Sequence, residues 1–79
     1  MPGHPARGRR SLRRGGLLNN LGRAYAALGE AATAIDYYQQ SLALYREVGI
    51  RRIEAEVLYD LGNAYYNLGE GERAIAYYE

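Results

Sequence analysis

The chain has 79 residues, enough for one small domain with a marginal core. Hydrophobic residues make up 48% and charged residues 24%, a composition typical of globular rather than disordered proteins. No apolar stretch approaches the roughly 18 residues that a membrane span needs. The absence of cysteine excludes disulfides and thiolate zinc sites and fits a reducing compartment. We therefore expect a cytoplasmic protein without a membrane partner.

Charge is divided unevenly along the chain. Residues 1–29 contain six arginines and no acid, whereas residues 30–79 contain four arginines and nine acids. This asymmetry is typical of a basic arm attached to an acidic folded body. Because residues 1–14 combine five arginines with two prolines and two glycines, we predict a basic disordered tail over residues 1–15.

Three other interpretations of this basic segment are weaker. A secretory signal needs an apolar run after Arg9-Arg10, but the following residues are interrupted by asparagines and an arginine. An organelle presequence needs an amphipathic helix, which the prolines and glycines disfavour. An arm that binds nucleic acid through its arginines is the remaining weaker alternative.

A 19-residue segment recurs after a shift of 40 residues. Leu21–Gln39 (LGRAYAALGEAATAIDYYQ) and Leu61–Glu79 (LGNAYYNLGEGERAIAYYE) are identical at eleven of 19 positions. A fixed period of this length is the signature of a stacked repeat architecture. We therefore predict tandem repeats over residues 16–79, with repeat 1 at 16–50 and a partial repeat 2 at 51–79.

Within a repeat, apolar residues follow two stripes with helical spacing. The first stripe ends at Gly29, which suits the left-handed conformation that often closes a helix. Gly22 lies inside the first helix, where we expect it to allow close approach of the small residues Ala31 and Ala34. The first stripe is Leu18, Leu21, Tyr25 and Leu28, and the second is Ala31, Ala34, Ile35, Tyr38, Leu42 and Tyr45.

The predicted fold is therefore all-α, a series of antiparallel helix-turn-helix repeats. We expect helices at about 16–28, 31–48, 52–68 and 71–79, which amount to one and a half repeats of an α-solenoid. Isolated repeats cannot bury their apolar faces. We therefore expect Ile75 and Tyr78 to be partly exposed and the chain to be partly unfolded or to associate with itself through exposed repeat faces.

These residues resemble the tetratricopeptide repeat (TPR) family, whose pattern combines Leu-Gly, Tyr, Gly, Ala and an aromatic residue. The 40-residue spacing looks like the longer variant found in kinesin-light-chain-like proteins and bacterial signalling arrays. In the first repeat the matching residues are Leu21, Gly22, Tyr25, Gly29, Ala34 and Tyr38. In the second they are Leu61, Gly62, Tyr65, Gly69, Ala74 and Tyr78.

The resemblance implies recognition of a peptide or partner helix in a concave groove lined by the first helix of each repeat. The mapped residues are Asn19, Arg23, Ala26 and Ala27, followed by Tyr59, Asn63, Tyr66 and Asn67. Asparagine amides suit an extended peptide backbone, and Arg23 suits a carboxylate. The carboxylate clamp of some family members needs a basic residue where this chain has Asn19, which disfavours that ligand.

No catalytic, metal or cofactor site is predicted. His4 is the only histidine, and Glu54, Glu56 and Asp60 have no histidine to complete a metal site. The repeated tyrosine pairs favour core packing over stacking on bases, so nucleic acid is not an expected partner. The prediction is a non-catalytic scaffold for protein interactions. A regulatory appendage of a larger signalling ATPase or transcription regulator is the alternative.

Overall fold

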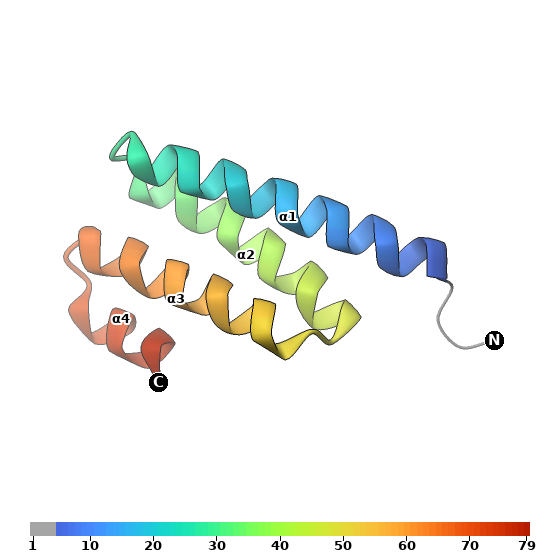
Figure 1. The fold of residues 1–79 in the computed structure, drawn as a ribbon. Coiled ribbons are helices and arrows are strands. Elements are labelled where there is room, and N and C mark those ends of the chain that lie inside the picture. Colours follow the sequence, from blue (N-terminus) through green and yellow to red (C-terminus); the bar gives the residue numbers. More distant parts are fainter. Residues whose placement is uncertain (1–4) are drawn as a thin grey trace.

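A computed structural model describes residues 5–79, which form four α-helices (Figure 1). The helices are α1 (Pro5–Ala27), α2 (Ala31–Val48), α3 (Arg51–Asn67) and α4 (Gly71–Tyr78). Successive helices run antiparallel and pack side by side, so α2 lies between α1 and α3, and α3 between α2 and α4. This arrangement confirms the predicted all-α repeat fold. None of the four described helices combines the length and the apolar character needed to cross a bilayer.

The turn inside each repeat has the same hydrogen bonds in both copies. Gly29 and Gly69 have φ values of 81° and 82°, a conformation that side chains with a Cβ rarely adopt. The amide of Glu30 donates to the Tyr25 carbonyl at 2.9 Å, and the amide of Glu70 donates to the Tyr65 carbonyl at the same distance. This 6→1 pattern closes a helix and turns the chain back.

The core lies where α2 and α3 meet and extends to both neighbours. Buried apolar side chains come mainly from α2 and α3, and Leu12 and Tyr25 of α1 pack against them. Two members of the predicted first stripe, Leu21 and Leu28, are instead exposed. Leu21 is exposed because, among the described residues, α1 packs on α2 and meets no helix on its opposite side. Leu28 lies in the turn after α1, and its equivalent Leu68 is exposed too.

The first helix begins eleven residues before its predicted start at residue 16. Pro5 is its first residue, where the missing amide hydrogen breaks no bond within the helix. Further along, Ser11 is buried and Leu12 packs on the core, which anchors a segment expected to be a disordered tail. The tail prediction is therefore wrong from Pro5 onward, and residues 1–4 lie outside the described residues.

The close contact at Gly22 differs from the predicted one. A Cβ on Gly22 would lie 2.5 Å from Cε1 of Tyr38, so the tyrosine ring rather than Ala31 or Ala34 occupies the space. One helical turn further along α2, buried Ser41 donates a 2.7 Å hydrogen bond to the Gly15 carbonyl of α1. The small residues along α1 therefore admit the ring and the hydroxyl of α2.

Candidate functional site

The first helices of the two repeats, α1 and α3, are joined by one ion pair. The Nε atom of Arg23 lies 3.2 Å from a carboxylate oxygen of Asp60. Arg23 was a predicted groove residue, whereas Asp60 was considered only as a metal ligand and rejected. The pair therefore connects the two repeats across the face on which the groove was predicted.

Tyr38 lies behind this ion pair. Its ring packs over Gly22, and the side chain is buried. Burial raises the pKa of the Tyr38 hydroxyl, the Asp60 carboxylate raises it further, and the Arg23 guanidinium partly offsets both. On the predicted groove face of repeat 1, a charged pair therefore lies near the Tyr38 phenol.

The equivalent place in repeat 2 has uncharged residues. Asn63, which corresponds to Arg23, accepts a hydrogen bond from the Tyr78 hydroxyl through its Oδ1 atom. The rings of Tyr59 and Tyr78 have centroids 5.5 Å apart and are tilted by 47°. Because its Oδ1 already accepts a bond, Asn63 presents its amide hydrogens to a ligand.

The eight predicted groove residues differ in their accessibility. Ala27, Tyr59, Tyr66 and Asn67 are exposed, Arg23 is exposed but ion-paired, and Ala26 and Asn63 are half-buried. Asn19 is buried, and its Oδ1 atom has no hydrogen-bond partner among the described residues. A ligand cannot reach Asn19 in this conformation, which differs from the expectation of an open groove residue.

Sequence reasoning missed the pairing of Asp60 with Arg23, and it did not place Tyr38 and Tyr78 beside the predicted groove residues. Asp60 lies one helical turn before Asn63, so a comparison of adjacent first helices would have placed it opposite Arg23. The tyrosine pairs stack within each repeat: the centroids of Tyr25 and Tyr37 are 5.5 Å apart. Those of the equivalent pair, Tyr65 and Tyr77, are 5.2 Å apart.

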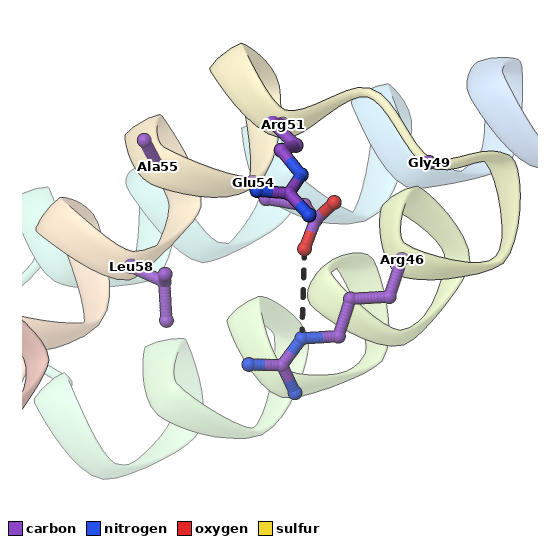
Figure 2. A pocket seen from close by; sticks show the side chains of 6 residues that line it. All are labelled: Arg46, Gly49, Arg51, Glu54, Ala55 and Leu58. Carbon is purple, nitrogen blue, oxygen red and sulfur yellow. Dashed lines mark ion pairs between the residues drawn. The ribbon is translucent and has the colours of Figure 1, made fainter.

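A separate hollow of about 450 Å³ lies at the turn between α2 and α3 (Figure 2). Its rim holds an ion pair in which Nε of Arg46 lies 3.7 Å from a Glu54 oxygen. Leu58 contributes an apolar wall, and Arg51 lies beside Glu54. None of the predicted groove residues lines this hollow, so we regard it as a junction between repeats rather than the binding face.

Paired antiparallel helices, repeated glycine turns and a tyrosine packed on Gly22 and on its equivalent Gly62 define an α-helical repeat protein. The model of the tetratricopeptide repeat family matches residues 13–79. The chain belongs to this family. No curated protein and no solved structure matches it significantly. Tetratricopeptide repeats generally mediate protein–protein interactions and are typically non-catalytic.

Proposed function

We propose that the chain is a non-catalytic interaction module that binds an extended peptide segment of a partner protein. The proposed binding face is formed by α1 and α3 on the side of the Arg23–Asp60 pair. The observation that carries the proposal is Asn63, whose amide is oriented by the Tyr78 hydroxyl. An amide held in this way donates to a peptide carbonyl without the entropic cost of first being ordered.

The side chains beside Asn63 suit a peptide rather than a small charged ligand. Tyr59 and Tyr66 are exposed tyrosines of α3 and provide ring surfaces for apolar side chains. Asn67 lies one turn beyond Asn63 and provides a second amide. This mixture of rings and amides is typical of surfaces that bind a backbone and alternate side chains.

In repeat 1, the proposed groove favours a partner segment with an acidic side chain. Arg23 has its Nε atom committed to Asp60 but keeps its terminal guanidinium nitrogens for an acidic side chain. Asn19 is buried and is not a basic residue, so we do not propose capture of a terminal carboxylate. The proposed ligand is therefore an internal segment with an acidic side chain near Arg23 and an apolar one near Tyr66.

The test is selection of peptides from a phage-displayed random library on the immobilised chain. Selected peptides are then titrated by calorimetry against Asn63→Ala and Tyr66→Ala. Each variant is expected to weaken binding about tenfold or more, the effect of losing a central contact. Gln40→Ala is the matched control, because Gln40 is an exposed amide on α2 away from this face.

Equal affinity for Asn63→Ala, Tyr66→Ala and Gln40→Ala would contradict the proposed face. Chemical-shift mapping of the amides with the selected peptide gives an independent readout. Shifts confined to α2 and α4 would place the ligand elsewhere on the molecule. Selection of peptides without any acidic residue would contradict the role of Arg23.

A further inference from the structure

The repeats make it possible to compare a helix that has a neighbour with an equivalent helix that lacks one. Val57 and Leu61 of α3 are both 0% exposed, because α3 packs against α2. The residues 40 positions earlier, Leu17 and Leu21 of α1, are 63% and 38% exposed. The surface with which α3 covers α2 is therefore present on α1, but it covers nothing there.

Among the described helices, α4 packs against α3 and has no neighbour on its other side. Ile35 and Tyr38 of α2 pack in the core, and Tyr38 is only 3% exposed. The equivalent residues of α4, Ile75 and Tyr78, are 57% and 44% exposed. The part of the α2 surface formed by residues 31–38, on which α3 packs, is thus repeated on α4, where no described helix covers it.

We propose that a second copy of this chain covers this exposed face of α4. In this arrangement α1 of one copy packs against α4 of another, in the geometry by which α3 packs against α2 within each chain. The association is head-to-tail, so each copy keeps one free end for the next. This contact shares Asn63 and Tyr78 with the proposed peptide-binding face. It is tested separately from that face, because the mass of the chain is measured without any peptide.

Charge favours the same pairing. The described part of α1 carries Arg9, Arg10, Arg13, Arg14 and Arg23 and no acid. The segment from Glu70 to Glu79 carries three acids and one arginine. Arg9, Arg10, Arg13 and Arg14 correspond to residues 49–54 before and at the start of α3, so in this geometry they lie beyond the eight residues of α4 and attract the acids of this segment at long range, most strongly at low salt. Two α1 helices would repel each other, so charge disfavours pairing of like ends.

Two polar contacts of the internal junction have complementary counterparts in the proposed one. Within the chain, Arg23 of α1 pairs with Asp60 of α3. In the proposed contact, the positions shifted by 40 residues are Asn63 of one copy and Asn20 of the next, whose amides hydrogen-bond to each other. The 3.1 Å bond from Gln39 to the Tyr77 hydroxyl corresponds to Glu79 and Tyr37. A carboxylate accepts the hydrogen of a phenol, so neither counterpart leaves a polar group opposed by a like group.

The experiment uses one variant for each end. Ala24→Glu places a carboxylate on α1 at an exposed position whose equivalent, Ala64, is buried in the internal junction. Ile75→Glu places a carboxylate on α4 at an exposed position whose equivalent, Ile35, is partly buried against the core. Ala43→Glu, at an exposed position of α2, is the control. Alanine and glutamate are both good helix formers, so the two alanine variants are expected to fold alike, as circular dichroism will verify.

Sedimentation is measured over a series of concentrations at low salt. The unchanged chain and Ala43→Glu are expected to form species that grow with concentration. Each end variant alone is expected to stay near the monomer mass of 8.8 kDa. The corresponding dissociation constant should rise at least about tenfold, because each change would bury an unpaired carboxylate.

Mixing the two end variants separates head-to-tail pairing from other modes. Ala24→Glu keeps an intact α4 face, and Ile75→Glu keeps an intact α1 face. An equimolar mixture is therefore expected to form a dimer of twice the monomer mass that does not grow further. A mixture that stays monomeric, disruption by only one of the two variants, or a monomeric unchanged chain would each overturn the proposal.

Discussion

Tyr38 and Tyr78 occupy the same position in two copies of one repeat, yet their surroundings differ. Each ring packs over the helical glycine of its own repeat, and a Cβ at Gly22 or Gly62 would lie 2.5 Å from the nearest ring carbon. Tyr38 is enclosed, with Asp60 and Arg23 near its hydroxyl, whereas Tyr78 is largely exposed and bonded to Asn63. The repeated residues build the same helix pair, and the following helix decides whether that pair is closed.

This comparison separates two kinds of stabilising contact. Contacts within a repeat, such as the stacked tyrosines and the glycine turns, are present in both copies. Contacts between repeats, such as the burial of Leu61, occur once. Equivalent substitutions in the two copies should therefore differ only where the contact between repeats is involved.

The largest difference is expected between Leu61→Ala and Leu21→Ala. Leu61 is completely buried between helices, so its truncation should cost about 2–5 kcal/mol. A domain of this size has only about 3–5 kcal/mol to lose, so most of the helical signal should disappear. Leu21 is partly exposed, and its truncation should cost less than about 1 kcal/mol.

Urea titrations followed by far-ultraviolet circular dichroism will measure both variants. They should be made at low protein concentration, because Leu21 lies on the face proposed for self-association. Equal losses of stability would show that Leu21 is as enclosed as Leu61. That result would contradict the difference between the two ends of the stack.

A smaller difference is expected between Gly22→Leu and Gly62→Leu. Helix propensity favours leucine over glycine in both places by about 1 kcal/mol. In repeat 1 the new side chain meets the enclosed ring of Tyr38, so we expect a net cost of about 1–3 kcal/mol from overpacking. In repeat 2 the exposed ring of Tyr78 can rotate away, and the change should be close to neutral.

Thermal melting of both glycine variants provides the measurement. A gain in stability for Gly22→Leu would show that the ring of Tyr38 moves as freely as that of Tyr78. Gly8→Leu serves as a control for propensity, because a Cβ at Gly8 would meet no atom within 4 Å. This control should be stabilised or unchanged.

The sequence repeat was sufficient to predict the helix pairs, because apolar spacing and glycine turns are local signals. Local rules failed for the start of α1, because Pro5 is tolerated as its first residue and because burial of Ser11 and packing of Leu12 on the core outweighed the effect of Gly8. They also failed for the partner of Gly22, because a long side chain one turn further along α2 reaches the glycine before alanine does. Such contacts depend on how two helices are placed.

The groove residues show the same limit. Arg23 and Asn63 were mapped as groove residues from the family resemblance; Arg23 pairs with Asp60 of α3, whereas Asn63 accepts a bond from Tyr78 of α4. The burial of Asn19 and the pairing of Asp60 depend on the angle between repeats. The sequence pattern of a single repeat does not determine that angle.

The smallest expected effect concerns the two tyrosine hydroxyls at high pH. Tyrosine ordinarily ionises near pH 10. Burial, with a further contribution from Asp60, raises the pKa of Tyr38 in the folded chain, so the folded state holds this proton more tightly than the unfolded state. The resulting stability is complete below about pH 10 and is lost as the pH rises through the raised pKa.

Tyr38→Phe removes this loss, so its melting temperature should fall less steeply above about pH 10 than that of the unchanged chain. The pKa of Tyr78 is also raised, first because its hydroxyl is partly removed from water and then because of its neighbours Tyr59 and Tyr66. Solvent screens these effects, because the side chain is exposed. Tyr78→Phe should therefore change the slope less. Slopes rather than absolute melting temperatures are compared, because each substitution also removes a hydroxyl at neutral pH. Identical slopes for the two variants would mean that the Tyr38 hydroxyl is no better shielded from solvent than the Tyr78 hydroxyl.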